Sequence, residues 1–440
     1  MSLSFSPDSL AAALQQQPAP RRWVVAYSGG LDSSVLLHAL AQLAPAIPCC
    51  ALHINHRLAA QSDQWQQHCA AACARWRIDF FAVTVAVTPA GEGPEAAARH
   101  ARYAAFEQFL QAGDCLLQAH HLDDQAETLL LRLLRGSGPR GLAGIRPQRN
   151  LGRGTLLRPL LAWRRDQLHD YARERGLDWI EDGSNADTRF DRNYLRHSVL
   201  PLLAARWPDY RQRLDQTAAL CAATERLNRD QAEADLAALQ PRGERLGQSI
   251  DLPQLRAWPG YRRHNVLRHW FASQQLSTPA LVHLQQVEQQ LLDVRASAAA
   301  AVAWGELEVR SYGERLYCLP SLPAPADRVL QWCPDTVLLL PDGGLLAASS
   351  ATGGAGRLRP VSRVEVRRRR GGERCRPHDR GHSQTLKKLL QERRLEPWLR
   401  DRVPLIYVDG KLAAVGDLWV CRGFVAEAGE PGLELDWRFD

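Results

Sequence analysis

The sequence lacks the features that mark membrane, secreted and metal-cluster proteins. Its longest Ala-rich stretch, Ala298–Trp304, is far too short to cross a bilayer. The first residues carry no basic segment followed by an apolar core, so we expect no secretion signal. The ten cysteines include no C-x-x-C pair, which favours reduced thiols and predicts neither a zinc site nor an iron–sulfur cluster. We therefore expect a cytoplasmic protein with no membrane partner.

Net positive charge is missing from most of the chain. The formal charge is +7, and the segment Arg363–Arg402 alone holds 14 Lys and Arg against 6 Asp and Glu. The remaining 400 residues therefore sum to about −1. This concentration favours a polyanion that docks on one segment. A basic surface with no dedicated ligand is the alternative.

A strand, a glycine turn and a helix are predicted near the N-terminus. Trp23–Tyr27 is apolar like a buried strand, and a helix pattern follows the turn. Glycine lets the backbone approach a phosphate, and the N–H groups of a first helical turn attract anions. The chain has no G-x-x-x-x-G-K-[ST], so this is not a Walker A loop. An ordinary tight turn is the alternative. The turn and helix start comprise Ser28, Gly29, Gly30, Leu31, Asp32 and Ser33.

Strand and helix patterns alternate up to about residue 205. This predicts an α/β fold, a doubly wound, Rossmann-like parallel sheet with helices on both faces. Ligands of such sheets bind beyond the carboxyl ends of the strands, so Ser28 and His120 should share one crevice. The expected divisions are a catalytic domain at 1–213, a mainly helical middle domain at 214–319, a linker region with short strands at 320–356, and a basic α+β domain at 357–440.

Acidic residues begin the helix that follows His120. Asp123, Asp124 and Glu127 lie in its first two turns. The helix dipole favours these carboxylates, but they repel one another, so we expect a cation there, either Mg²⁺ or a substrate ammonium. Solvated helix-capping acids are the alternative.

A polar helix face with three arginines is predicted further along. Arg189, Arg192, Asn193 and Arg196 stand at i, i+3, i+4 and i+7. Guanidinium groups on one face suit phosphate contacts or a developing negative charge. A solvated face is the plainer alternative.

In their order, these motifs resemble those of the tRNA(Ile)-lysidine synthetase family, within the N-type ATP pyrophosphatases that contain a PP-loop. The resemblance lies in Ser-Gly-Gly-x-Asp-Ser, His-His-x-Asp-Asp-Gln-x-Glu-Thr, Ser-Asn-x-Asp-x-x-Phe-x-Arg-Asn-x-x-Arg and a C-terminal block ending in Ala-Val-Gly-Asp-Leu-Trp-Val. It covers nearly the whole chain. It implies ligation of L-lysine to C2 of the wobble cytidine of the CAU-anticodon isoleucine tRNA, through an adenylated cytidine, with release of AMP and pyrophosphate.

The resemblance also implies roles for individual residues. The catalytic set would be Asp32, Asp124, Glu127, Asn193 and Arg196. The ATP site would comprise the six residues Ser28 to Ser33 together with His53 and His120. Mg²⁺ would be held by Asp32, and the lysine ammonium by Asp124 and Glu127. The tRNA would contact Arg189, Arg192, Arg367, Arg368, Arg369, Arg370, Arg374, Arg376, Lys387, Lys388 and Trp398. The expected partners are this tRNA, L-lysine and, in a homodimer, a second copy of the chain.

Two other functions stay open at this stage. A PP-loop tRNA 2-thiolase would need a catalytic cysteine pair or a cluster-binding C-x-x-C, and the sequence contains neither. A non-catalytic RNA-binding protein with a vestigial ATP fold would not need both the acidic and the arginine motifs.

Overall fold

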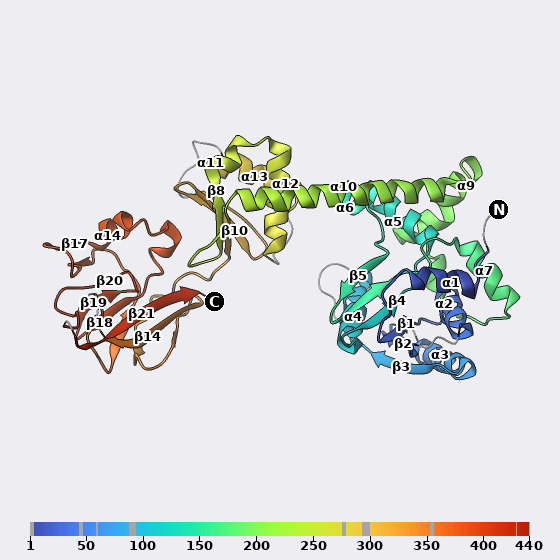
Figure 1. Ribbon diagram of the computed structural model, residues 1–440, viewed down its shortest axis with the longest axis horizontal. Helices are drawn as coiled ribbons and strands as arrows, with labels where there is room; N and C mark the ends of the chain where they lie inside the picture. Colours follow the sequence, from blue (N-terminus) through green and yellow to red (C-terminus); the bar gives the residue numbers. More distant parts are fainter. Residues whose placement is uncertain are drawn as a thin grey trace. The chain divides into compact units, whose positions relative to one another are not determined.

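The computed structural model describes residues 4–43, 47–58, 60–87, 94–274, 279–292, 300–352, 356–427 and 429–439. They divide into two compact units, Met1–Leu227 and Asn228–Asp440 (Figure 1). The division falls inside helix α10 (Tyr210–Ala238), after the boundary predicted at residue 213. None of the helices described is long and apolar enough to cross a membrane.

The first unit is built on a six-stranded sheet in the order β3-β2-β1-β4-β6-β5. All neighbouring pairs are parallel except that of β5 with β6, so the predicted doubly wound sheet is confirmed. The strand order reverses between β1 and β4, and the crevice for a ligand is expected beyond the ends of these two strands. The strands are β1 (Arg22–Ala26), β2 (Cys49–Asn55), β3 (Asp79–Thr84), β4 (Asp114–Leu117), β5 (Gln148–Leu151) and β6 (Gly154–Leu157).

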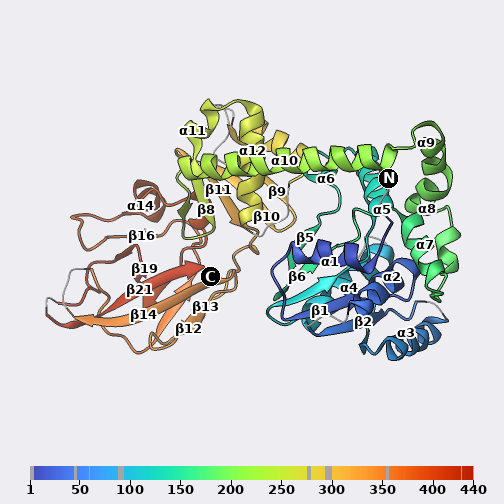
Figure 2. The same cartoon turned by 45° about the vertical axis from the view of Figure 1, so that its right-hand side comes forward.

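Alternate residues of the central strands point to opposite faces of this sheet. Trp23 and Val25 join a core with α1, α2, α3 and α7, whereas Val24 packs in a second core with α4 (Figure 2). Both faces are therefore covered, which explains why the four residues of β1 after Arg22 are all apolar. The helices are α1 (Pro7–Gln15), α2 (Leu31–Gln42), α3 (Ser62–Trp76), α4 (Pro94–Phe109) and α7 (Arg165–Glu174).

The remaining helices of this unit carry the acidic and arginine motifs. They are α5 (Leu122–Leu134), α6 (Pro139–Leu142), α8 (Asp191–Tyr194), a π-helical turn (Leu195–Val199) and α9 (Leu200–Arg206). The prediction of one regular helical face from Arg189 to Arg196 is wrong. Arg189 precedes α8, and the π-helical turn changes the spacing of the residues after Tyr194. Such turns often occur at functional sites.

The second unit begins with helices and a five-stranded antiparallel sheet in the order β7-β8-β11-β10-β9. The mainly helical character of residues 214–319 was predicted, but three of the strands, β7, β8 and β9, carry no strand pattern in the sequence. These have two to four residues each and show no clear alternation. The elements after α10 are α11 (Leu252–Ala257), α12 (Gly260–Ser273), α13 (Leu281–Val287), β7 (Arg242–Gly243), β8 (Gln248–Asp251), β9 (Ala301–Trp304), β10 (Leu307–Tyr312) and β11 (Arg315–Pro320).

The C-terminal part forms two antiparallel sheets, β12-β15-β18-β19-β20 and β13-β14-β21, and the small pair β16-β17. Asp-Gly is a typical hairpin sequence, and Asp409 and Gly410 between β18 and β19 both have positive φ (48° and 73°), as a type I′ turn requires. The strands and helix are β12 (Leu330–Trp332), β13 (Leu338–Leu339), β14 (Gly344–Thr352), β15 (Val364–Arg367), β16 (Arg374–Cys375), β17 (Gln384–Thr385), α14 (Leu386–Glu392), β18 (Leu405–Val408), β19 (Lys411–Val415), β20 (Trp419–Val420) and β21 (Pro431–Phe439).

The linker region expected at 320–356 is largely part of this fold. Residues 330–352 supply β12, β13 and β14, and β14 pairs along its whole length with β21. Trp332 and Leu346 belong to the C-terminal core. The glycine-rich residues 353–355 lie outside the described residues.

Candidate active site

The turn after β1 requires glycine at one position. Gly29 has φ of 84°, which residues with a side chain rarely adopt. A Cβ there would lie 2.5 Å from Ile180 Cδ1 and 2.8 Å from Cys69 Sγ. The next glycine, Gly30, has φ of −74° and no neighbour closer than 3.5 Å to such a Cβ. Gly29 therefore fixes the course of the loop.

Two serines hold this loop against the start of α2. Ser33 Oγ donates to the Gly30 carbonyl oxygen (3.0 Å) and lies 3.1 Å from Ser28 Oγ. No side chain caps α2 at Gly30, so the N–H groups of its first turn are available to an anion. The predicted phosphate-binding residues thus share one loop.

His121 connects this loop to the acidic helix. Its ring Nδ1 accepts from the backbone N–H of Asp124 (3.3 Å), and its backbone N–H donates to Asp124 Oδ2 (3.0 Å). On the other side of the ring, Nε2 lies 3.5 Å from Asp32 Oδ2. Burial lowers the pKa of His121, but Asp124 and Asp32 raise it by more, so the net pKa is raised. His121 therefore lies between the loop after β1 and the acidic helix after β4. The crevice predicted for Ser28 and His120 stays a prediction.

The carboxylates of Asp124 and Glu127 bond to two guanidinium groups. Arg192 Nη2 donates to Asp124 Oδ1 (2.7 Å), and its Nε donates to Glu127 Oε2 (2.6 Å). Arg196 Nε donates to Glu127 Oε1 (2.7 Å). Burial would raise the pKa of Asp124, but His121 and Arg192 lower it to about 2, so this carboxyl is ionised at neutral pH. The cation predicted beside these acids is provided here by the protein's own arginines.

Two residues of the arginine motif lie apart from the acids. Arg189 is exposed and pairs with Asp187 (2.7 Å between Nη2 and Oδ2). Asn193 Nδ2 donates to the Asp187 carbonyl oxygen (2.9 Å). Asn193 therefore fixes the turn before α8, and Arg189 belongs to the surface of that turn.

The two predicted histidines lie on either side of β1, His53 within β2 and His120 just after β4. His53 Nδ1 bonds to the Tyr27 carbonyl oxygen (2.9 Å), and burial lowers its pKa. His120 Nδ1 accepts from Arg158 Nε (3.1 Å). Burial is the main cause that lowers the pKa of His120 to about 4, so its ring is neutral at pH 7.

Sequence reasoning missed two residues that complete the site, Arg158 and Arg211. Arg158 Nε donates to the His120 ring. Asp123 accepts from Arg211 Nε and from the backbone N–H of Arg165 (2.9 Å). Asp123 therefore joins the starts of α5, α7 and α10. Arg158 and Arg211 stand in no recognisable motif, so only their contacts reveal them.

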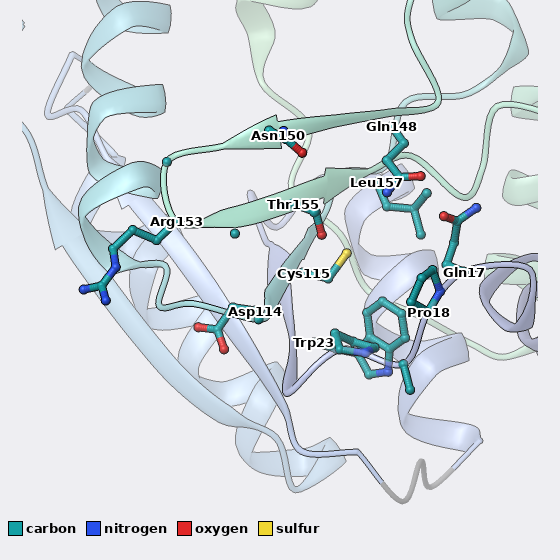
Figure 3. Close-up of a pocket in the computed structure, with 15 residues that line it drawn as sticks. Gln17, Pro18, Trp23, Asp114, Cys115, Gln148, Asn150, Arg153, Thr155 and Leu157 are labelled. Atoms are coloured by element: carbon teal, nitrogen blue, oxygen red, sulfur yellow. The ribbon is translucent and has the colours of Figure 1, made fainter.

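A cavity of about 670 Å³ adjoins the acids. Leu31, Glu127, Arg165, Trp179 and Arg196 are among the residues that line it. It is large enough for an amino acid beside the PP-loop. A second cavity, of about 460 Å³, lies at the opposite ends of the strands, around Trp23, Cys115 and Thr155 (Figure 3). It includes none of the predicted site residues.

Asp32 is the predicted metal ligand. Its Oδ1 is buried and has no hydrogen-bond partner. The described part of the chain holds no group of three or more His, Cys, Asp or Glu that could bind a metal ion. A metal at Asp32 would therefore need further ligands from a substrate.

The predicted tRNA-contacting residues of the C-terminal domain are not equally accessible. Arg370, Arg374, Lys387 and Lys388 are exposed, whereas Arg367, Arg369 and Arg376 are half-buried. The last three bond to Glu365, Asp401 and the Arg380 carbonyl oxygen, respectively.

Two of these predictions are corrected by the structure. Arg368 is only 7% exposed and pairs with the fully buried Asp342. Trp398 packs edge-on against Tyr312 and Tyr317, with ring centroids 6.2 and 4.9 Å apart. Both side chains stabilise the second unit; Arg368 is buried and not presented to a ligand, whereas Trp398 is half-buried.

The parallel sheet and the Ser-Gly-Gly loop at its switch point define a PP-loop ATP-binding protein. Residues 6–203 match the PP-loop domain, residues 250–317 the TilS substrate binding domain, and residues 364–437 the TilS substrate C-terminal domain.

Similar proteins narrow this class to one family. The chain is 43% identical to the tRNA(Ile)-lysidine synthase of Alkalilimnicola ehrlichii, with 97% of this chain and 96% of that protein covered. It is 40% identical to the synthase of Coxiella burnetii (98% and 96% covered) and 40% identical to that of Serratia proteamaculans (98% and 99% covered). The chain belongs to the tRNA(Ile)-lysidine synthase family.

Proposed function

We propose that this protein ligates L-lysine to C2 of the wobble cytidine of the CAU-anticodon isoleucine tRNA and consumes ATP to AMP and pyrophosphate. The observation that carries the proposal is the link through His121 between the PP-loop and the acids Asp124 and Glu127. This link lets one crevice serve both the activating nucleotide and an amine. Membership of the synthase family supports the same reaction. We also propose a cytoplasmic location.

In the first step, the cytidine O2 attacks the α-phosphate of ATP. The N–H groups of the loop from Ser28 to Ser33 bind the leaving pyrophosphate. His53 and His120 border the nucleotide as neutral rings. Asp32 fits Mg²⁺, because its Oδ1 lacks a partner and Mg²⁺ commonly binds one carboxylate together with substrate phosphates. The bound ion would offset negative charge on those phosphates.

In the second step, the ε-amine of lysine attacks C2 and expels AMP. Lysine reaches the acids through the cavity beside Glu127 and Arg196. Its ammonium competes with Arg192 and Arg196 for the carboxylates, and a displaced guanidinium can turn to the adenylate phosphate. A carboxylate of this pair then accepts the proton that the amine must lose.

The tRNA body binds the exposed basic residues of the C-terminal domain. Arg370, Arg374, Lys387 and Lys388 are exposed, although Arg370 pairs with Asp327 and Lys388 with Glu392. Arg367, Arg369 and Arg376 are half-buried. Arg189, which is also exposed, can contact RNA from the first unit. Phosphate contacts of this kind weaken steeply as salt rises.

The test is an incubation of the purified protein with ATP, labelled lysine and bulk tRNA. We expect label in RNA and one AMP released for each lysine attached. AMP release that depends on a sulfur donor would instead indicate a thiolase, and RNA binding without turnover a non-catalytic protein.

A further inference from the structure

We propose that an arginine cluster beside His120 binds the RNA backbone next to the cytidine that is modified. The cluster consists of Arg99 of α4, Arg146, Arg149 of β5 and Arg158 at the end of β6. The proposal deepens the proposed function, because it assigns the side from which the RNA strand enters the crevice.

Tyr103 of α4 organises the cluster. The guanidinium carbons of Arg99 and Arg149 lie 5.0 and 4.8 Å from its ring centroid. Arg158 Nη1 donates to the Arg146 carbonyl oxygen (2.6 Å), and its Nε donates to His120 (3.1 Å). The cluster is therefore continuous with the crevice at the end of β4.

The charge of this cluster is not neutralised by the protein. Within the described residues, none of its four guanidinium groups forms an ion pair with a carboxylate, whereas Arg192, Arg196 and Arg211 all do. Arg158 is only 6% exposed. Burial lowers the pKa of Arg158; Tyr103 raises it, but the charges of Arg149 and Arg99 lower it further, and the net pKa is lowered. Buried charge without a counterion is costly, which favours a bound anion.

An RNA strand fits this cluster better than the phosphates of ATP. The pyrophosphate already has a site in the loop at the end of β1. The arginines come from α4, β5, β6 and the segment before β5, an arrangement that suits several successive phosphates. An enzyme that acts on a base must also hold the flanking nucleotides while the base enters the site.

The test removes two charges from the cluster, together and one at a time, and compares a control that removes one charge outside it. Arg99→Gln/Arg149→Gln alters the cluster. Arg153→Gln removes a charge from the turn of the same β5–β6 hairpin, where Arg153 lies beside the second cavity (Figure 3). The probes are an RNA hairpin that contains the anticodon stem and CAU loop, and ATP alone, with both affinities measured directly.

We expect the double variant to bind the hairpin about tenfold more weakly. The slope of log affinity against log salt concentration should fall by about 1.4, since each phosphate contact to a single strand contributes about 0.7. ATP affinity should stay within about twofold, and Arg153→Gln should match the wild type. Weaker ATP binding with unchanged hairpin binding would assign the cluster to the nucleotide and overturn the proposal. If Arg153→Gln and the double variant lost hairpin affinity equally, the loss would reflect the overall charge of the protein and would overturn the proposal.

Two further results separate this proposal from the proposed function. If the wild type attaches no lysine but the double variant still loses hairpin binding, the RNA surface stands and the ligase reaction fails. If the double variant does not fold, Arg99→Gln alone decides, because Arg99 is exposed. Unchanged hairpin affinity and salt slope in that variant would also overturn the proposal.

Discussion

Arg196 and Glu127 form a two-bond ion pair, with Nε 2.7 Å from Oε1 and Nη2 3.0 Å from Oε2, although 69 positions separate them. The Glu127 side chain is fully buried, and Arg192 bonds to the same carboxylate. The pair couples the acidic helix α5 to the π-helical turn. A substrate ammonium must therefore compete with two guanidinium groups for one carboxylate.

The first prediction concerns this pair. Glu127→Gln should lower the free energy of unfolding by about 2 kcal/mol, less than for a fully buried pair because Arg196 is partly exposed. Arg196→Gln should cost a similar amount, and the double variant clearly less than the sum. Urea unfolding measures all three. Asp187→Asn, in an exposed pair, should cause no measurable change. Additive losses from Glu127 and Arg196 would show that the pair is not coupled.

The second prediction compares the two glycines of the PP-loop. Gly29→Ala should destabilise the protein by about 2 kcal/mol, through its positive φ and the overlap with Ile180, and should weaken ATP binding. Gly30→Ala has space for its methyl group and should fold almost as stably as the wild type. Thermal unfolding with and without ATP measures both effects. Equal stability of the two variants would contradict the loop geometry.

The third prediction is a pH dependence set by His120. Because its folded pKa is about 4 and its ordinary pKa is 6.5, the unfolded chain takes up the proton first as pH falls. The contribution of His120 to the free energy of unfolding is fully present above pH 6.5 and is lost as pH falls towards about 4. The loss is about 3 kcal/mol, at about 1.4 kcal/mol for each pH unit. Urea unfolding between pH 7 and 4 measures this loss, and the free energy of unfolding of His120→Asn should decline less steeply than that of the wild type. An identical decline would mean that His120 is not buried as a neutral ring.

The fourth prediction separates contact residues from structural ones in the C-terminal domain. Lys387→Gln/Lys388→Gln should lower the slope of log tRNA affinity against log salt concentration by about 2 and leave the stability of the protein unchanged. Arg368→Gln should instead destabilise the second unit, because it leaves the buried Asp342 with one partner fewer. Filter binding across a salt series and thermal unfolding measure the two properties. If the Arg368→Gln variant were stable but bound tRNA weakly, Arg368 would be a tRNA contact and not a structural residue.

Features fixed by neighbouring residues could be predicted from the sequence. The strand Trp23–Tyr27, the glycine turn and the helix after it are local patterns, as is the turn at Asp409. The acids and the arginines were each predicted to meet a ligand, because each motif alone carries unbalanced charge. No pattern connects Asp124 to Arg192, which lies 68 positions away, so their mutual neutralisation emerged only in the folded chain.

The errors in the C-terminal domain have a similar origin. Arg368 stands in a run of arginines that resembles a solvated basic surface. Its partner Asp342 lies in a segment rich in proline and glycine that was predicted to be a linker region with short strands. The strands of that segment are short, and their pairing partners β15 and β21 come later in the chain.

The central claim is that the crevice between the PP-loop and the acidic helix joins lysine to cytidine. The direct measurement is mass spectrometry of nucleosides from tRNA incubated with the protein, ATP and lysine. We predict a cytidine derivative heavier by one lysine less one water, absent without ATP and absent with Asp124→Asn, although that variant still binds tRNA. No such nucleoside from the wild type, or an undiminished amount from Asp124→Asn, would contradict the account.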